Sequence, residues 1–366
     1  MKIAYISLHW PRTSQSSVGN KINMQITNWR NSGHDVRLFM HTHTVANTEA
    51  LLEGEVFIYN QKNGFIFREF KRILALRSLL RSVKRFRPDL IYLRYGVYIF
   101  GLQQLNKIAP VCVEVNTNDL VEHRRLGKAI SFYNKITRSI TLTSASAFVF
   151  ESQSLIDKPC FSKFQKTSTL IGNGIDLSRM DPLPAPNNPT PRLVFVGTAG
   201  FSWHGVDKLE ILANRYPDLH IDVIGYEALP NGNAKNPPKN LQFHGFLAQE
   251  SMREIFRKAD AAISSMALHR IQKMDATPLK TLEYLAYGLP VILPYQDANL
   301  KELEADFLLH IPDDETNIVA HAEEIHQFVW QMRGKRAPRF VIAPYIDSAV
   351  KEKERLEFFE KIIINH

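Results

Sequence analysis

Short apolar runs alternate with longer amphipathic segments through the first half of the chain. The runs are nearly continuous and rich in β-branched and aromatic residues, which is typical of strands buried on both faces of a parallel sheet. Segments with apolar residues every three or four positions separate the runs and predict covering helices. The expected strands are Lys2–Leu8, Val36–Met40, Leu90–Leu93, Val111–Val115, Phe148–Phe150 and Ser168–Ile171, and the expected helices include Gly19–Ser32 and 67–88.

The alternation begins again after a proline-dense stretch from Pro182 to Pro191, which predicts a stiff, exposed linker. The second set of expected strands and helices comprises strands 193–197, 219–224, 241–243, 261–264 and 310–311, helices 206–216 and 249–259, and a charged amphipathic helix at 348–364. We therefore expect an α/β protein with two Rossmann-like domains, 1–181 and 192–345, joined by the linker 182–191. Residues 346–366 would form a C-terminal helix that packs back on the N-terminal domain. Ligands would bind in a cleft between the domains, at the carboxyl ends of the parallel strands.

The segment from Asp275 to Ile292 is the most informative part of the chain. It reads as a loop, a short helix that Gly288 ends, and a buried strand. Lys280 lies at the start of this helix, where free N–H groups and the helix dipole favour an anion, so a lysine there indicates a phosphate ligand. Glu283, one turn further on, is placed to accept hydrogen bonds from a vicinal diol such as a ribose. The alternative is a surface helix with ordinary charges.

Composition restricts the class of protein. The chain has 366 residues, 45% of them hydrophobic and 22% charged, which is ordinary for soluble globular proteins. Cys112 and Cys160 provide neither a disulfide framework nor a metal-binding pattern and indicate a reducing compartment. The N-terminus reads as a core strand rather than a secretion signal, and no apolar run is long enough to span a membrane. We therefore expect a cytoplasmic protein, at most peripheral on the inner face of the cell membrane.

The net charge of +8 is concentrated in the helix expected at 67–88, which is both basic and amphipathic. Three interpretations remain open for it: a solvated face over a core-packed helix, a nucleic-acid patch, or a surface for anionic lipid. No zinc finger, aromatic RNA-binding pattern or helix-turn-helix signature supports nucleic acid, so we expect no nucleic-acid partner.

Several familiar site types are missing from the sequence. There is no dinucleotide-binding Gly-x-Gly-x-x-Gly, no P-loop and no nucleophile elbow, which argues against nicotinamide dehydrogenases and ATPases. There is also no Asp-x-Asp pair to hold a metal on a diphosphate, so we expect no metal cofactor. A glycine-rich turn with Gly197 and Gly200 follows an expected strand and would let backbone N–H groups approach an anion. The turns at Gly225 and at Phe246-Leu247 would present backbone groups to a planar base.

Together these features resemble the nucleotide-sugar glycosyltransferases of the GT-B fold, family 4. The matching segments are Phe195-Val196-Gly197 with Trp203-His204-Gly205, Asn173-Gly174-Ile175-Asp176, the block from Asp275 to Ile292 and, less specifically, 88–95 and 114–116. The similarity spans nearly the whole chain. The block Pro-Leu-Lys…Glu-Tyr-Leu-Ala…Gly-Leu-Pro-Val-Ile is its specific part.

The resemblance implies roles for individual residues. Glu283 matches the second acid of the family's Glu-x7-Glu motif and would bind the ribose hydroxyls, while Lys280 and the backbone N–H groups of Leu279 and Lys280 would bind the diphosphate. Asp275 takes the place of the first glutamate, which in the family faces the transferred sugar. Thr198 and His204 stand where the family has an Arg/Lys pair, and Arg270 or Lys273 would then supply the missing charge.

On the N-terminal domain, the end of strand 111–115 would face the cleft. We expect Glu114 and Asn116 to point to opposite sides, which favours Asn116 together with Asp119 as catalytic residues beside Asp275. Gly19 and Arg94 would contact the acceptor.

The resemblance therefore implies a retaining, metal-independent glycosyltransferase that moves a sugar from a nucleotide diphosphate, with UDP favoured, to a saccharide acceptor. A lipid-linked acceptor in polysaccharide biosynthesis, with helix 67–88 on an anionic membrane surface, fits the basic charge. Two alternatives remain: a non-catalytic nucleotide-sugar-binding scaffold, or a nucleotide-sugar epimerase of the same fold.

Overall fold

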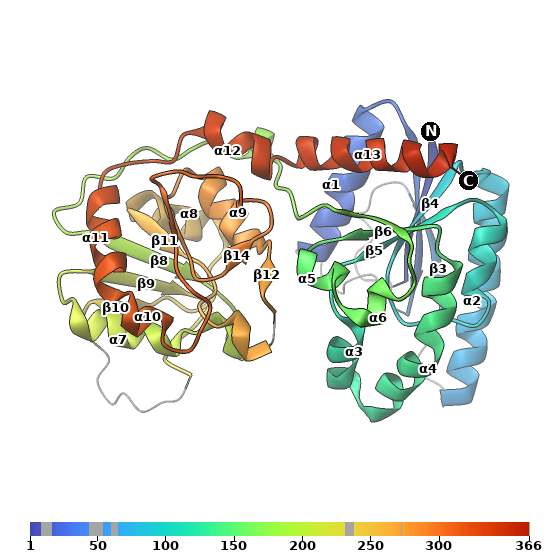
Figure 1. The fold of residues 1–366 in the computed structure, drawn as a ribbon, viewed down its shortest axis with the longest axis horizontal. Coiled ribbons are helices and arrows are strands. Elements are labelled where there is room, and N and C mark those ends of the chain that lie inside the picture. The colour runs from blue at the N-terminus through green and yellow to red at the C-terminus, as the bar shows by residue number, and fades with distance from the viewer. Residues whose placement is uncertain (9–16, 44–53, 60–64, 231–237, 272, 366) are drawn as a thin grey trace. The chain divides into compact units, whose positions relative to one another are not determined.

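The computed structural model describes residues 1–8, 17–43, 54–59, 65–230, 238–271 and 273–365, and it divides into two compact units. Unit 1 comprises Met1–Ile171 with Lys351–His366, and unit 2 comprises Gly172–Val350. In both units helices flank a parallel sheet (Figure 1).

Unit 1 contains a seven-stranded sheet with the order β3-β2-β1-β4-β5-β6-β7, in which every pairing is parallel. Its strands are β1 (Lys2–Ser7), β2 (Asp35–Thr42), β3 (Gly54–Ile58), β4 (Leu90–Arg94), β5 (Val111–Val115), β6 (Ala147–Phe150) and β7 (Thr167–Leu170). Its helices are α1 (Ser17–Asn31), α2 (Phe65–Phe86), α3 (Asp119–Glu122), α4 (Lys128–Ser144), α5 (Gln153–Ile156), α6 (Pro159–Ser162) and most of α13 (Ser348–Ile364), with 3₁₀ turns at Leu102–Lys107 and His123–Leu126.

Alternation along the strands gives this sheet two apolar faces. Ala4 and Ile6 of β1 face the core that α2 covers, whereas Ile3 and Tyr5 face the core that α1 and α13 cover. Leu79 and the other buried leucines of α2 recur at helical spacing, which explains why a helix with so many cations still packs on the sheet.

Unit 2 repeats this design with a six-stranded sheet of order β10-β9-β8-β11-β13-β15 and a separate pair, β12-β14. Its strands are β8 (Arg192–Val196), β9 (His220–Ile224), β10 (Leu241–Phe243), β11 (Ala261–Ile263), β12 (Asp275–Ala276), β13 (Val291–Leu293), β14 (Gln296–Asp297) and β15 (Leu308–His310). Its helices are α7 (Asp207–Arg215), α8 (Gln249–Lys258), α9 (Leu279–Ala286), α10 (Asn317–Ala320), α11 (Ala322–Met332) and α12 (Arg339–Ile346), with 3₁₀ turns at Leu177–Arg179, Ser202–His204 and Leu268–Ile271.

The α/β class and the two parallel sheets expected from the sequence are confirmed. Within each sheet the strand order reverses at one point, between β1 and β4 in unit 1 and between β8 and β11 in unit 2. Ligands of open parallel sheets bind outside the carboxyl ends of the strands at such a point. Among the described helices, none is long and apolar enough to cross a bilayer.

The division between the units differs from the linker expected at 182–191, because it falls between Ile171 and Gly172. The proline-dense stretch instead belongs to unit 2. Leu183 is buried there and its N–H donates to the carbonyl of Tyr287 at 3.0 Å, while the Asn188 side chain donates to Asp260 at 2.8 Å. These contacts hold the segment against the second sheet.

Candidate functional site

Helix α9 is fixed against the carboxyl ends of the two central strands of unit 2. The Tyr284 hydroxyl accepts a hydrogen bond from the N–H of Val196 at 2.7 Å. The Thr281 hydroxyl lies 2.8 Å from that of Ser264, just beyond β11, and Tyr295 closes a buried triangle of hydroxyls with both. The first turn of α9 is therefore held at the point where the strand order reverses.

Lys280 extends from this turn over the ring of Phe195, with Nζ 4.4 Å from the ring centroid. Its Nζ is buried and has no hydrogen-bond partner in the described part of the chain. Burial alone lowers the pKa of Lys280 to about 7. Because a buried ammonium without an acceptor is costly, this position is suited to an anion that the described protein groups do not provide.

Glu283, one turn further along α9, is half-buried. Burial, with no charged or hydrogen-bonding neighbour contributing, raises the pKa of its carboxyl to about 7. The N–H groups of Leu279 and Lys280 open the helix and therefore have no acceptor within it. One short helix thus presents a cation, a carboxyl group and free backbone donors to the same end of the sheet. Gly288 ends the helix with φ +81°, as expected.

The glycine-rich turn after β8 depends on close approach of two backbones. Gly225 has φ +86°, and a Cβ atom there would lie 1.9 Å from the carbonyl oxygen of Gly197. The N–H of Gly225 donates to the carbonyl of Gly245 at 2.6 Å, so the turns after β8, β9 and β10 are joined. Gly200, with φ +90°, lies in open space on the same loop. Beyond Gly245, the ring of Phe246 is 87% exposed, whereas Leu247 packs on the core of unit 2.

His204 holds this turn in place. Its Nδ1 lies 3.3 Å from the N–H of Thr198 and 2.8 Å from the Tyr226 hydroxyl, which also donates to the carbonyl of Thr198. Burial and the nearby Lys280 charge lower the pKa of His204 to about 3. The ring is therefore neutral at physiological pH and supplies no replacement cation.

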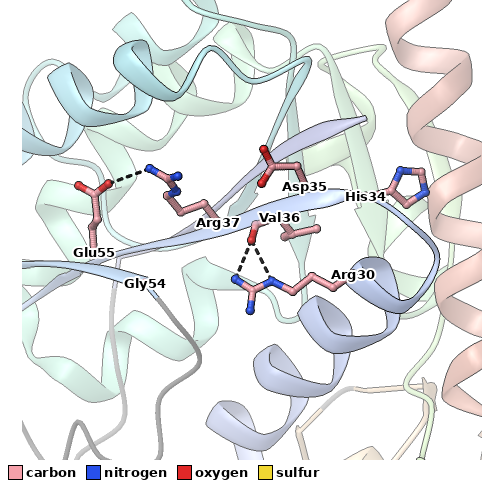
Figure 2. A pocket seen from close by; sticks show the side chains of 7 residues that line it. All are labelled: Arg30, His34, Asp35, Val36, Arg37, Gly54 and Glu55. Atoms are coloured by element: carbon pink, nitrogen blue, oxygen red, sulfur yellow. Dashed lines mark hydrogen bonds and ion pairs between the residues drawn. The ribbon is translucent and has the colours of Figure 1, made fainter.

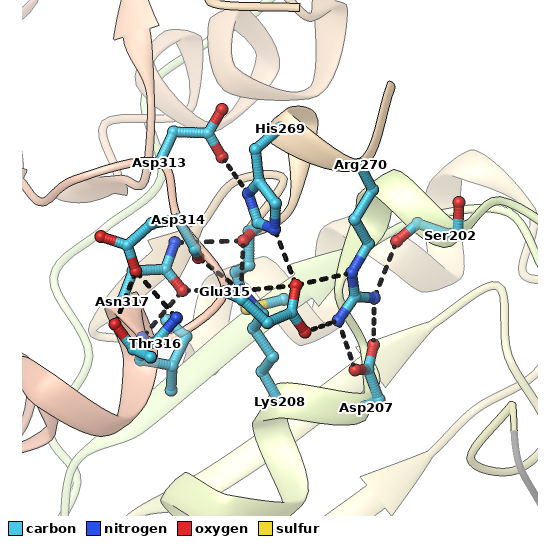
Figure 3. Close-up of polar contacts among 12 residues, drawn as sticks. Ser202, Asp207, Lys208, His269, Arg270, Asp313, Asp314, Glu315, Thr316 and Asn317 are labelled. Carbon is cyan, nitrogen blue, oxygen red and sulfur yellow. Dashed lines mark hydrogen bonds and ion pairs between the residues drawn. The ribbon is translucent and has the colours of Figure 1, made fainter. Parts of the chain in front are cut away.

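The guanidinium of Arg270 is also occupied by hydrogen bonds to other residues of the chain (Figure 3). It donates to both carboxylate oxygens of Asp207, at 2.9 and 2.8 Å, to Glu315, and to the carbonyl of Ser202 at 3.1 Å. These partners raise the pKa of Arg270 above its usual range. Arg270 thus fixes the 3₁₀ turn at Ser202–His204 to the start of α7, and Lys280 is the better candidate for a phosphate.

The loop that leads into α9 is held by Asn173, which belongs to a segment that resembles the family but received no role from the sequence. The N–H of Asn173 donates to the Thr277 hydroxyl at 3.1 Å, and the Asn173 amide donates to the carbonyl of Thr277 at 2.8 Å. Asn299 donates in turn to the carbonyl of Asn173 at 2.7 Å. Asp275 is buried at the start of this loop, in β12, where it pairs with Gln296 of β14.

In unit 1, Asp119 lies inside a structural ion pair. Its carboxylate accepts two hydrogen bonds from Arg138, both at 2.8 Å, one from Asn134 at 2.6 Å and one from the Tyr95 hydroxyl at 3.3 Å. Both oxygens are therefore occupied, which is typical of a structural carboxylate rather than of a base that faces a substrate.

A second polar cluster lies at the carboxyl ends of β4 and β5. Lys21 contacts Glu114 at 3.1 Å and donates to Asn116 at 2.8 Å, and Arg94 donates to Glu114 at 3.0 Å. The expectation that Glu114 and Asn116 point to opposite sides is wrong, because residues two apart on a strand project to the same side. Sequence reasoning did not select Lys21 as a site residue. Its position on α1, the helix that follows β1, is the sequence feature that could have identified it. Gly19 is buried in the first turn of that helix.

One further pocket, lined by Arg30, His34, Asp35, Val36, Arg37, Gly54 and Glu55, lies at the amino ends of β2 and β3 (Figure 2). Arg30 donates twice to the carbonyl of Val36 there, at 3.0 and 2.7 Å. Because parallel sheets bind ligands at the opposite ends of their strands, this pocket is not the candidate site. Unit 2 has a cavity of about 1180 Å³ beside β14 and β15, lined in part by Lys273, Asp297 and His310.

Comparisons with known proteins agree with the fold of the chain. Residues 190–328, which contain the candidate site of unit 2, match the family model described as "Glycosyl transferases group 1". The resemblance inferred from the sequence is thereby confirmed for this segment. Curated protein sequences give no match.

Solved structures match over the whole chain. Sucrose-phosphate synthase from Thermosynechococcus elongatus superposes with a TM-score of 0.71 at 14% identity, covering 100% of both chains. The lipopolysaccharide outer core galactosyltransferase WaaB gives 0.69 at 13% identity, covering 99% of this chain and 100% of that one. The pneumococcal O-GlcNAc transferase GtfA, solved with UDP and GlcNAc, gives 0.67 at 12% identity and covers 99% of both. The chain therefore has the GT-B fold, and two of the solved structures that share this fold contain UDP and a sugar.

Proposed function

We propose that this protein is a retaining glycosyltransferase that transfers a sugar from UDP to a saccharide acceptor. The observation that carries the proposal is the buried Lys280 Nζ, which has no hydrogen-bond partner among the described residues and lies at the start of α9. A diphosphate supplies the acceptor oxygens and the negative charge that this ammonium lacks. UDP, rather than another nucleotide, is proposed because solved structures with the same fold contain it.

Each group around α9 then has a task. Lys280 and the N–H groups of Leu279 and Lys280 bind the diphosphate, and Glu283 accepts hydrogen bonds from the ribose hydroxyls. When the bond between the anomeric carbon and the diphosphate oxygen breaks, negative charge develops on the leaving oxygen beside Lys280. These donors are already oriented by the contacts of Tyr284 and Thr281, so they stabilise that charge without rearranging.

The acceptor hydroxyl forms the new bond to the anomeric carbon on the face that the diphosphate leaves, and its proton passes to the leaving phosphate oxygen. Asp275 remains the proposed contact to the transferred sugar. In unit 1, Asn116 and Arg94 are proposed acceptor contacts beside Lys21 and Glu114, whereas the hydrogen bonds of Asp119 favour a structural role.

The finer parts of the proposal concern setting and cofactors. A lipid-linked acceptor in polysaccharide biosynthesis at the cytoplasmic face of the membrane would suit the basic helix α2, since anionic lipid attracts each well-placed Lys or Arg by about 1 kcal/mol. We also propose that no metal is required, because Lys280 and the start of α9 neutralise the diphosphate.

Calorimetric titration with UDP, GDP and ADP, each with and without EDTA, tests the proposal. We expect UDP alone to bind in the micromolar range with an affinity that EDTA does not change. Transfer from a UDP-sugar to a saccharide acceptor, with the anomeric configuration followed by NMR, separates a transferase from the alternatives. Binding without turnover would indicate a scaffold, and conversion of the donor sugar without an acceptor would indicate an epimerase. Failure of all three nucleotides to bind would refute the donor site.

A further inference from the structure

Helix α4 exposes a stripe of apolar side chains and buries two strongly polar ones. Phe132, Ile136 and Ile140 recur every fourth residue and are 67, 59 and 39% exposed. On the opposite face, Asn134 and Arg138 are 1 and 4% exposed. This reverses the usual arrangement of a helix that packs on a soluble protein.

The inner face of α4 is fixed by specific bonds. Asn134 and Arg138 donate to the buried carboxylate of Asp119, at 2.6 Å and twice at 2.8 Å. Rotating the helix to bury its apolar stripe would leave that carboxylate and guanidinium without partners, at a cost of several kcal/mol. The apolar stripe is therefore held outward by the fold.

Helix α2 exposes a single stripe that changes character along its length. Its first part is apolar, with Phe67, Phe70 and Leu74 at 48, 56 and 41% exposure. Its second part is basic, with the exposed side chains of Arg77, Arg81 and Lys84.

The two helices are neighbours on one flank of unit 1, where Figure 1 draws them alongside each other. Both contact the 3₁₀ turn at Leu102–Lys107, and Tyr133 of α4 lies within electrostatic range of Arg72 of α2. Arg72 also donates to the carbonyl of Tyr98 at 3.2 Å, two residues before Phe100, which is 65% exposed. We call the exposed residues Phe67, Phe70, Leu74, Phe100, Phe132, Tyr133, Ile136 and Ile140 the apolar flank.

We propose that the apolar flank inserts into the surface of an anionic bilayer, with the cations of α2 and α4 on the lipid headgroups. Contiguous exposed apolar side chains mark an interaction surface, and the charges around this one select the partner. Helix α4 contains no acidic residue, and the only acid of α2, Glu69, is paired with Arg72 at 2.7 Å. An anionic bilayer offers both an apolar layer and negative headgroups over a broad area, as this surface requires.

This inference rests on the proposed function for its biological purpose, since a lipid-linked acceptor would lie in the same bilayer. It adds that attachment is hydrophobic as well as electrostatic. A purely electrostatic contact would disappear in concentrated salt, whereas inserted side chains would keep part of the binding.

Sedimentation with vesicles tests the proposal in the full-length protein. We expect binding to phosphatidylglycerol/phosphatidylcholine vesicles, with a measurable part retained in about 0.5 M NaCl, where charges are screened beyond a few ångströms. The double variant Phe132→Ser/Ile136→Ser should bind at least about tenfold more weakly, because two side chains that insert into the bilayer are lost. The matched control Ile211→Ser/Val319→Ser, at residues of unit 2 that are 42 and 47% exposed, should bind like the unaltered protein.

Two further measurements keep the outcomes distinct. The affinity for UDP is measured for every variant, so that loss of vesicle binding with unchanged UDP affinity supports the surface, and loss of UDP binding with normal vesicle binding counts against the donor site alone. Equal vesicle binding by both double variants would overturn the proposal. So would a concentration-dependent dimer that Phe132→Ser/Ile136→Ser abolishes without any vesicle binding, because the flank would then contact a second copy.

Discussion

The charge of Lys280 is suited to binding an anionic ligand. Without a ligand, the same buried charge destabilises the folded state. Its pKa in the folded state, about 7, lies below the ordinary 10.5, so the charged form opposes folding. This cost is complete below pH 7 and disappears as the pH approaches 10.5, because the neutral amine then prevails in both states.

The variant Lys280→Met should therefore be more stable than the unaltered protein while losing function. Methionine has a similar shape and keeps the contact with Phe195, so at pH 7 we expect a gain of about 1–3 kcal/mol in unfolding free energy. We also expect UDP affinity to fall by about 10- to 100-fold, since a charge-assisted contact to the diphosphate is lost. Differential scanning fluorimetry and calorimetry measure the two effects.

The same substitution at Lys273, the other cation proposed from the sequence, is the control. Lys273→Met should leave both the melting temperature and the UDP affinity nearly unchanged. If Lys273→Met weakens UDP binding while Lys280→Met does not, the diphosphate has been assigned to the wrong cation.

Lys280 and Glu283 predict a bell-shaped pH dependence of donor binding. Above about pH 7 Lys280 loses its proton, and below about pH 7 Glu283 gains one, so each limb removes a contact to the ligand. Titrations should use a UDP-sugar, whose diester diphosphate keeps its charge over this range. Lys280→Arg should remove the alkaline limb and Glu283→Gln the acid limb. An affinity that is constant from about pH 5.5 to 9 would contradict both assignments.

Asp119 allows a test between a structural and a catalytic role. If it serves Arg138, Asp119→Asn should destabilise unit 1 by about 3–5 kcal/mol, because a buried guanidinium loses its charged partner. The double variant Asp119→Asn/Arg138→Met should recover part of that loss, as measured by urea unfolding. A large fall in kcat with an unchanged urea midpoint would instead restore Asp119 to the catalytic residues.

At the scale of elements, the joined turns after β8, β9 and β10 leave almost no space for a side chain at Gly225. Gly225→Ala would place a methyl group 1.9 Å from the carbonyl oxygen of Gly197 and would also strain a backbone with φ +86°. We expect a loss of more than about 3 kcal/mol in the stability of unit 2. Gly200→Ala shares the positive φ but meets open space, so about 1 kcal/mol is expected. Similar urea midpoints for the two variants would show that the close approach is unimportant.

The elements that the sequence predicted well are those whose apolar pattern matches their burial. Strand 111–115 and helix 348–364 were expected with the bounds observed, and the short helix containing Lys280 was expected from its apolar spacing and from Gly288. Helix α4 was not predicted. Three of its apolar residues, Phe132, Ile136 and Ile140, face outward while Asn134 and Arg138 are buried, so periodicity alone gives no reason to place Arg138 inside.

The candidate site shows the same limit. Sequence reasoning could propose Lys280 and Glu283 together because both lie on one short helix, which the structure contains. It also offered Arg270 as a phosphate ligand, because the sequence does not reveal that Glu315 lies 3.0 Å from its Nε. Pairing between residues far apart in the chain decides which cations remain available, and this information exists only in the folded protein.

At the scale of the whole molecule, the chain ends in the unit where it began. Glu352 of α13 accepts from the indole N–H of Trp29 at 2.7 Å, and Arg355 donates to the Tyr92 hydroxyl at 3.1 Å. Phe359 is fully buried, 5.3 Å from the ring of Trp29. The C-terminal residues therefore complete the core of unit 1, whereas the proposed donor residues all lie in unit 2.

This division predicts that the two units respond to different changes. Phe359→Ala should lower the free energy of unfolding of unit 1 by about 3–5 kcal/mol, because the substitution leaves a cavity. The melting temperature of unit 1 should fall accordingly. UDP at about 100 times its dissociation constant should raise the free energy of unfolding of unit 2 alone, by about 2.7 kcal/mol. Scanning calorimetry measures both shifts, and Phe340→Ala, at a side chain that is 80% exposed in unit 2, should change neither. If the units unfold in two separate transitions and UDP raises the one that Phe359→Ala lowers, then the donor binds unit 1 and the assignment of the donor site to α9 fails.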